Sequence, residues 1–325
     1  MLKKAVLACA LASVLPLCAQ VKITQGEGKV SVSVDGKPFT DFVYQADDYA
    51  KPYLWPILAA DGTAVTRYWP MDKTHEGEST DHPHHRGLWF GHGEVNGFDF
   101  WANEQASHTK NPGKQIVKNI KVKSGGKEGT ITCDIEWTGG GNVLLVEHRT
   151  MTFYSGETSG PTNRQIDFDL RLEPKTKVTF GDTKEGTFSM RLAAPLEYEQ
   201  KRGPKEPART GLMVNAQGKK GEDEDWGKRS EWMDYSGVIN GEKLGIAMFD
   251  NPHNPGFPNR WHTRGYGLYG INPFGVHDFD KAATQAGGVT IEPGHELRYR
   301  FRVLIHPGDA ETAKIGEKYW AWANR

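Results

Sequence analysis

The chain is poor in cysteine, with only three in its 325 residues, and two of these, Cys9 and Cys18, fall within the first 19 residues. The remainder keeps a single thiol, Cys133, and cannot form an internal disulfide bond. A mature chain of about 300 residues is long enough to bury a stable core without such cross-links. Cys133 lies in an alternating segment on the side of Ile131 and Ile135, so we expect a buried, unreactive thiol.

The chain also lacks a cluster of basic residues and a long hydrophobic run. Lys and Arg number 40 against 41 Asp and Glu, which gives a formal net charge of −1. Nucleic-acid binding relies on clustered Lys and Arg that neutralise phosphates, so the sequence predicts no nucleic-acid partner. A helix needs about 20 apolar residues to cross a bilayer, and we predict no membrane span.

The N-terminal segment predicts export. Lys3 and Lys4 precede an apolar run over 5–17 that suits a signal peptide and is too short for a stable membrane span. We predict a signal peptide over residues 1–19, a mature chain that starts at Gln20, and a periplasmic or secreted protein. Cys18 leaves a lipoprotein as the alternative, although Leu17 is a poor fit to the small residue expected before it.

Helical periodicity is scarce as well, whereas turn residues and alternating segments are abundant. The chain has 38 glycines and 10 tryptophans, a combination that favours strands and turns over a helical bundle. Asp35-Gly36 and Asn240-Gly241 each separate two alternating segments, the strongest short signal for a hairpin. The predicted strands cover 29–34, 38–44, 53–59, 64–69, 88–92, 98–101, 116–122, 129–137, 142–154, 164–172, 178–180, 187–192, 265–271, 288–291 and 296–306, and a further hairpin is predicted over 238–250.

These patterns predict an all-β protein. The number of strands and the length favour one large two-sheet β-sandwich, similar to a supersandwich, over a small barrel. We expect a single domain over residues 20–325, with a charged surface excursion over 199–231. Only the C-terminus predicts a helix, over 310–323, with Asp309 as its N-terminal cap.

One segment, residues 81–101, is unusually rich in groups that carry chemistry. Four of the twelve histidines, His82, His84, His85 and His92, fall within eleven residues. Pro83 favours an extended backbone before it, so we expect His82 and His84 to share one face and His85 to point the opposite way. Imidazole serves as acid, base or metal ligand. The segment therefore predicts a polar site, with His82 and His84 as candidate ligands of a divalent metal.

The same segment carries candidate substrate-binding residues. Arg86 offers a planar cation beside Gly87, which suits a carboxylate or several hydroxyls. Trp89 and Trp101 offer aromatic faces on which an apolar ring face could stack. Phe90 and Phe100 have no polar group and are expected to be core.

A second segment, 181–191, places charged residues in a glycine-bracketed turn and on the strand after it. Glu185 beside Lys184 is a candidate general acid or base, although a solvated hairpin tip would look the same. Arg191 lies in an otherwise apolar strand and should need a partner there. We therefore treat Lys184 and Arg191 as candidate binding residues.

A third segment, 249–275, combines prolines and asparagines in a rigid polar loop. Trp261 and His262 repeat the pairing of an aromatic ring with an imidazole, and Asn272 follows. Aromatic faces take the C–H side of a polyol while polar groups take its hydroxyls. The segment predicts a small-molecule or oligosaccharide ligand, with His262 as a catalytic candidate and Trp261 and Asn272 as binding candidates.

Several of these runs together resemble a known family. Residues 81–90, 93–97, 183–186, 250–252 and 261–267 look like the secreted bacterial family labelled "methane oxygenase PmoA", over roughly residues 30–310. The label implies a metal-dependent oxygenase. The resemblance also implies a host bacterium that degrades polysaccharides.

The expected fold is similar to the galactose mutarotase-like supersandwich. In mutarotases a histidine acts as acid and a glutamate as base at C1 of a sugar. This resemblance implies His85 or His92 as the acid and Glu185 as the base.

Three hypotheses follow from the sequence. The first is an exported carbohydrate-active enzyme of the epimerase, lyase or hydrolase type, with proton transfer by His and Glu. The second is a metal-dependent oxygenase. The third is a non-catalytic glycan-binding protein, which the tryptophan-rich loops support equally well.

Overall fold

The computed structural model describes residues 20–45, 50–198, 207–284 and 287–324. The predicted signal peptide, including Cys18, lies outside these described residues. Within them, no helix is both long and apolar enough to cross a membrane.

The protein is an antiparallel β-sandwich, which confirms the predicted fold class. The first eight-stranded sheet has the order β1 (Val21–Gln25), β2 (Lys29–Val34), β3 (Lys37–Val43), β4 (Tyr53–Leu54), β5 (Leu88–His92), β11 (Gly186–Arg191), β16 (Leu268–Asn272) and β15 (Arg260–Trp261). The second has the order β12 (Leu212–Asn215), β13 (Trp232–Ile239), β14 (Glu242–Asp250), β18 (Leu297–Pro307), β9 (Arg164–Pro174), β8 (Asn142–Tyr154), β7 (Glu128–Gly139) and β6 (Lys114–Lys123). A small third sheet pairs β10 (Val178–Phe180) with β17 (Val289–Ile291).

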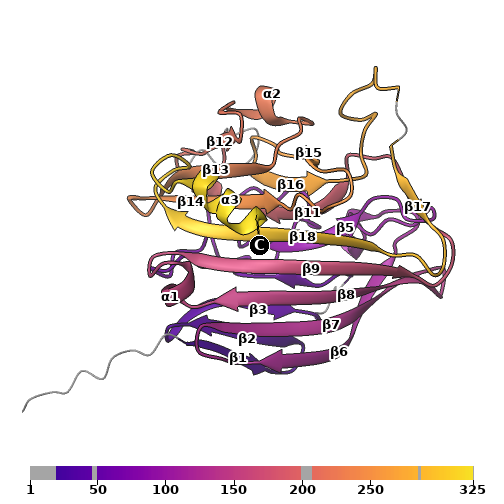
Figure 1. Cartoon of the computed structure of the whole chain (residues 1–325), viewed down its shortest axis with the longest axis horizontal. Helices are drawn as coiled ribbons and strands as arrows, with labels where there is room; N and C mark the ends of the chain where they lie inside the picture. Colours follow the sequence, from indigo (N-terminus) through magenta and orange to yellow (C-terminus); the bar gives the residue numbers. More distant parts are fainter. Residues whose placement is uncertain (1–19, 46–49, 199–206, 285–286, 325) are drawn as a thin grey trace, which may run out of the picture.

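Helices are few and short in the described residues. They are α1 (Gly156–Ser159), α2 (Glu222–Asp225), α3 (Ile315–Ala323) and the 3₁₀ turns η1 (Gln105–Ser107) and η2 (Ala194–Leu196). The predicted C-terminal helix therefore begins at Ile315 instead of Ala310. Lys314 has a φ of 54°, a left-handed conformation that interrupts the helix before that point. Figure 1 shows α3 lying against the second sheet, where it packs on Phe249 and Leu304.

Turn chemistry sets the hairpins as the sequence predicts. Asn240 and Gly241 both have positive φ, at 53° and 83°, and join β13 to β14 in an unbroken register. The predicted hairpin over 53–69 is wrong in its extent, because only β4 and an isolated bridge between Leu58 and Ala64 form. Pro56 has no N–H to donate to a ladder at that point. Strand β12, within the predicted surface excursion, was missed.

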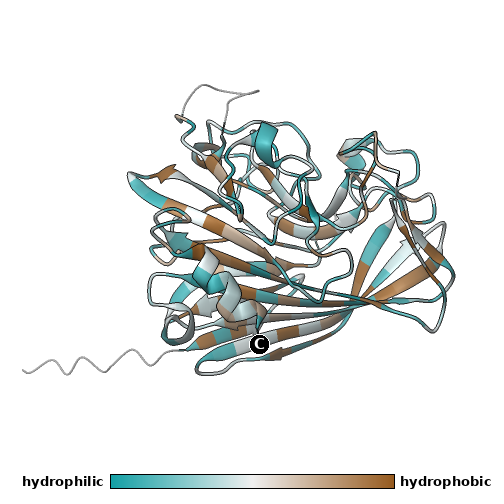
Figure 2. Cartoon of the chain, turned by 45° about the horizontal axis from the view of Figure 1, so that its top comes forward, coloured by the Kyte–Doolittle hydropathy of each residue, from teal (hydrophilic) through white to brown (hydrophobic). Residues whose placement is uncertain are grey.

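Side-chain alternation builds the core between the two sheets. Along β7 every second residue is buried, and the long strands in Figure 2 show the same alternation of hydrophobic and polar residues. One continuous hydrophobic cluster contains residues of both large sheets, including Phe188 and Phe301, whose rings stack at 4.5 Å. Cys133 belongs to this cluster, as predicted, and burial raises the pKa of its thiol to about 12.

Three neighbouring strands of the first sheet depart from this alternation. In β5, β11 and β16 every residue is buried. A strand is buried on both sides only when something covers its second face. Loops cover the outer face of these strands, and the candidate site lies there.

Candidate functional site

The outer face of the first sheet supplies the base of the site. In register, Trp89 of β5 lies opposite Ser189 of β11, which lies opposite Gly270 of β16. Their chain neighbours Phe90 and Phe188 point to the core instead. Gly270 leaves the room that Ser189 needs, because a Cβ there would lie 1.9 Å from the serine Oγ.

A cavity of about 610 Å³ opens above this face. All three segments singled out in the sequence contribute to it. Its lining residues are His82, His84, His85, Gly93, Glu94, Asp99, Trp101, Ala102, Thr183, Lys184, Glu185, His262, Arg264 and Tyr266.

The histidine segment forms a turn, which overturns the predicted extended geometry. The His85 N–H donates to the His82 carbonyl at 3.0 Å, and Pro83 follows His82 at the first central position of the turn. Proline favours that position because its ring fixes φ near −65°. The turn brings His82, His84 and His85 to the same cavity, so the prediction that His85 points away from the other two is wrong.

Four aromatic side chains form a continuous stack beside the cavity. The ring of Tyr266 stacks on His82 at 5.2 Å, His82 on His85 at 4.7 Å, and His85 on Trp89 at 5.3 Å. The interplanar angles are 7°, 3° and 20°. The Arg191 guanidinium lies over the Tyr266 ring at 4.8 Å. These contacts hold the imidazole planes in one orientation.

A buried charge network supports the turn from behind. Asp81 Oδ1 accepts hydrogen bonds from Arg67 Nη1 at 3.0 Å, Arg191 Nη2 at 3.1 Å and Ser79 Oγ at 3.1 Å. Asp81 Oδ2 lies 3.0 Å from His82 Nδ1. Burial raises the pKa of Asp81, but the His82 contact and the charges of Arg191 and Arg67 outweigh it and hold this pKa well below its usual value. The sequence predicts that Arg191 needs a partner in its otherwise apolar strand, and Asp81 is that partner.

Three cavity histidines are neutral at pH 7. Burial is the main cause, and it lowers the pKa of His84 to about 2 and that of His262 to about 3. Burial, with the nearby charge of Arg191, also lowers the pKa of His85 well below its usual value. A neutral imidazole offers one donor and one acceptor nitrogen to a ligand.

The Lys184–Glu185 turn forms the opposite wall. Lys184 Nζ and Glu185 Oε1 pair at 2.7 Å, and both side chains are more than a third exposed. Asn272 braces this turn, because its Nδ2 donates to the carbonyls of Thr183 and Lys184 at 2.9 and 3.0 Å. Asn272 therefore positions the wall and is not among the residues that line the cavity.

His92 lies away from the cavity, on the core side of β5. It shares a face with Phe90, its Nε2 is 2.7 Å from the Gly181 carbonyl, and its ring packs against Phe180 and Phe274. Burial lowers its pKa to about 4. Alternate residues of a strand share a face, and His92 is two positions after the core residue Phe90. Strand alternation alone therefore predicts a core position for His92.

Four other predicted residues also lie outside the cavity lining: Trp261, Arg86, Trp89 and Arg191. Trp261 is fully buried in the core and donates from Nε1 to the Ser230 carbonyl at 2.9 Å. Arg86 is buried, donates from Nε to the Pro83 carbonyl at 3.2 Å, and lies 6.0 Å from the Tyr53 ring centre. Trp89 is buried beneath the histidine stack.

Two important residues are not singled out from the sequence. Tyr266 closes the ring stack, and Asp81 anchors the turn. Trp101, which the sequence predicts as a stacking residue, stacks on His262 at 6.1 Å. The sequence signal for Tyr266 is its place in the run Arg264-Gly265-Tyr266, beside an arginine and a glycine. In the described part of the chain, no group of three or more His, Cys, Asp or Glu residues is placed to hold a metal ion.

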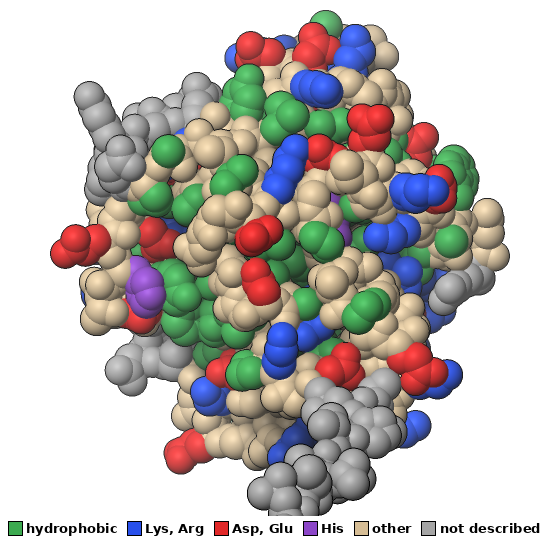
Figure 3. Space-filling model, turned by 90° about the vertical axis from the view of Figure 1, so that its left-hand side faces the viewer, with side chains coloured by type: hydrophobic (Ala, Val, Ile, Leu, Met, Phe, Trp, Pro, Cys, Tyr) green, Lys and Arg blue, Asp and Glu red, His purple; other side chains and the backbone are tan. Residues whose placement is uncertain are grey.

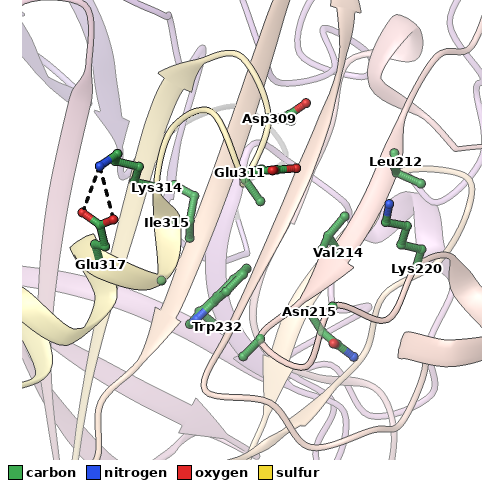
Figure 4. Close-up of a pocket in the computed structure, with 14 residues that line it drawn as sticks. Leu212, Val214, Asn215, Lys220, Trp232, Asp309, Glu311, Lys314, Ile315 and Glu317 are labelled. Carbon is green, nitrogen blue, oxygen red and sulfur yellow. Dashed lines mark hydrogen bonds and ion pairs between the residues drawn. The ribbon is translucent and has the colours of Figure 1, made fainter.

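A second cavity of about 490 Å³ lies between β12, β13 and the segment that leads into α3 (Figure 4). Its lining contains no histidine, and its Lys314 pairs with Glu317 at 3.3 Å. On the face of the molecule shown in Figure 3, positive and negative side chains are intermixed. We therefore place the candidate site in the histidine-lined cavity.

The fold and the cavity define a β-sandwich with a polar pocket on the outer face of one sheet. The chain belongs to DUF6807, a family of unknown function, whose family model matches residues 29–321. No curated protein matches the chain in sequence. This match does not identify the PmoA-labelled family, so the resemblance to that family stays a prediction.

Among the solved structures that are similar to the chain are two sugar-related enzymes. A beta-arabinopyranosidase shares 14% identity at a TM-score of 0.34 over 89% of this chain, which spans only 38% of that enzyme. A galactose mutarotase related enzyme from Lactobacillus acidophilus shares 11% identity at a TM-score of 0.30, over 88% of this chain and 97% of that protein. Scores this low carry no argument about the activity of this chain.

Proposed function

We propose that this protein is an exported enzyme that performs acid–base chemistry on a sugar or a similar polyol in the histidine-lined cavity. The observation that carries the proposal is the convergence of three distant segments, 82–85, 183–185 and 262–266, on one cavity. Clustered, environmentally perturbed titratable groups in a concave site favour a catalytic role.

The cavity wall suits a ligand with many hydroxyls. Trp101 and Tyr266 offer aromatic faces for its C–H side. His262 Nδ1 and Trp101 Nε1, on two side chains that line the cavity, are buried without a hydrogen-bond partner among the described residues. The cavity volume of about 610 Å³ accommodates a sugar of one or two rings.

Glu185 is the carboxylate that we assign to proton transfer. It lines the cavity, and its side chain reaches solvent beside Lys184. We propose that Glu185 takes a proton from the substrate and returns it later in the cycle. A neutral imidazole such as His84, whose Nδ1 contacts Ser107 Oγ at 3.2 Å, then hydrogen-bonds the oxygen on which negative charge develops.

The test is turnover of a panel of neutral and oxidised sugars, followed by NMR, with the Glu185→Gln variant beside the wild type. We expect this change to lower turnover by about 10²–10⁴-fold, the usual contribution of general acid–base catalysis, while the sugar still binds. Glu292→Gln is the matched control, because Glu292 forms a similar exposed ion pair with Lys177 outside the cavity. Equal turnover by wild type and Glu185→Gln contradicts the assignment. Binding without any turnover supports a glycan-binding protein instead.

A further inference from the structure

We infer that Asp81 and His82 form a carboxylate–imidazole dyad, in which His82 is the second proton-transfer group of the site and Asp81 is its positioning residue. The inference rests on the proposed function and adds a partner for Glu185. The sequence pointed to His82 only as a metal ligand and did not single out Asp81.

The contact between the two residues fixes which nitrogen meets a ligand. Asp81 Oδ2 lies 3.0 Å from His82 Nδ1, which is within ion-pair distance but outside hydrogen-bond alignment, and neither buried atom has another hydrogen-bond partner among the described residues. Nδ1 is therefore the ring nitrogen next to the carboxylate. His82 lines the cavity with its side chain 30% exposed, which leaves Nε2 as the nitrogen for the substrate.

The carboxylate is divided between two tasks. Its Oδ1 receives all three hydrogen bonds from Arg67, Arg191 and Ser79, and its Oδ2 is left for His82. The two arginines are buried and hold Asp81 in place as an ionised group. A carboxylate at Nδ1 orients the ring and stabilises the positive charge that an imidazole gains when Nε2 accepts a proton.

The ring stack removes the remaining freedom of His82. The rings of Tyr266 and His85 are both nearly parallel to the His82 ring, at 7° and 3°. His84, His85 and His262 have no carboxylate contact of this kind among the described residues. His82 is thus the cavity imidazole that is equipped to take up a proton.

The proposed step is a proton transfer without a change in oxidation state. Glu185 takes a proton from a substrate O–H or C–H, and the bond electrons remain on the substrate. His82 in its protonated form delivers the proton on Nε2 to the substrate at another atom. In the reverse half of the cycle the two groups exchange roles, so that both return to their starting states.

The first experiment needs no substrate. Long-range ¹H–¹⁵N NMR at pH 8 reports which imidazole nitrogen carries the proton, and the His82→Gln spectrum identifies the signals of His82. We expect the Nδ1–H tautomer in the wild type and a shift toward the Nε2–H tautomer in Asp81→Asn. Asp72→Asn is the matched control, because Asp72 contacts His75 Nδ1 at 3.2 Å on the surface. An Nε2–H tautomer of His82 in the wild type overturns the dyad.

The second experiment uses any sugar that the wild type turns over. Asp81→Asn and His82→Gln should each lower kcat by at least about 10²-fold with little change in KM. His82→Gln leaves Asp81 with both arginines, so it keeps the test valid if Asp81→Asn does not fold. Wild-type kcat in a folded His82→Gln variant overturns the inference. If the wild type turns over no sugar, the proposed function fails, and the tautomer measurement still decides whether the dyad exists.

Discussion

Burial sets the chemical character of four histidines in this protein. It is the first cause of the lowered pKa of His84, His85, His92 and His262. A neutral imidazole in a polar cavity is suited to recognising hydroxyls, whereas one in the core only satisfies a buried carbonyl. His262 and His92 therefore differ in chemical role because their surroundings differ: His262 lines the cavity and His92 lies in the core.

His92 offers a test of this effect on stability. Its pKa falls from 6.5 in the unfolded chain to about 4 in the folded protein. The unfolded state then binds more protons between these values, so this residue costs stability as the pH falls below 6.5. At pH 5 the cost is about 2 kcal/mol relative to pH 8.

We expect His92→Gln to remove this pH dependence while the amide still donates to the Gly181 carbonyl. The difference in free energy of unfolding between variant and wild type should therefore shift in favour of the variant by about 2 kcal/mol from pH 8 to pH 5. Urea unfolding at both pH values measures it. A difference that does not change with pH would contradict the assigned burial effect.

At the scale of elements, strand alternation divides the residues between core and site. In β5 the side chain of Trp89 points to the site, and the side chains of Phe90 and His92 point to the core. In β11 the same rule sends Arg191 to the site side with Ser189. The loops that follow these strands then supply the groups that line the cavity.

Gly87 joins the histidine turn to β5 and allows a close approach that no other residue permits. Its φ is 53°, and a Cβ there would lie 2.0 Å from the Leu54 carbonyl oxygen. We expect Gly87→Ala to destabilise the protein by about 3 kcal/mol or more, because backbone must move. Gly97→Ala is the control, since Gly97 has a φ of 80° and no atom within 4 Å of such a Cβ, so only the conformational cost of about 1–2 kcal/mol applies. Urea unfolding compares the two, and equal losses would contradict the role of the close approach.

At the scale of the whole molecule, both large sheets share one hydrophobic cluster. Phe168 of the second sheet contacts Phe188 of the first at 4.8 Å, so neither sheet buries its inner face without the other. The site lies on the outer face of strands whose inner face belongs to this core. The integrity of the site thus depends on the packing of the two sheets.

A shared core predicts that the chain unfolds as one unit, in line with the expected single domain over residues 20–325. Far-ultraviolet circular dichroism reports the sheets, and the fluorescence of Trp89 and Trp101 contributes a signal from the site. We expect both signals to change in a single coincident transition with urea. Two separated transitions would show that the outer loops and the sandwich unfold independently.

The sequence by itself determined the all-β architecture, most strand positions and the two-residue hairpin turns. Alternation and Asn-Gly or Asp-Gly pairs are local signals, and they act over a few residues that are neighbours in the chain. It also identified the three segments that form the cavity. The exact limits of β4 and α3 were not predictable, because they depend on single residues such as Pro56 and Lys314 in their tertiary surroundings.

Only the tertiary structure decided which residues of those segments meet. The turn at Pro83 gathers His82, His84 and His85, and the fold brings Asp81 to Arg67 and Arg191, which lie 14 and 110 positions away. The stack of Tyr266 on His82 likewise joins loops that are distant in the chain. Such contacts depend on long-range packing and burial, which no local pattern records, and the same burial keeps His84, His85 and His262 neutral.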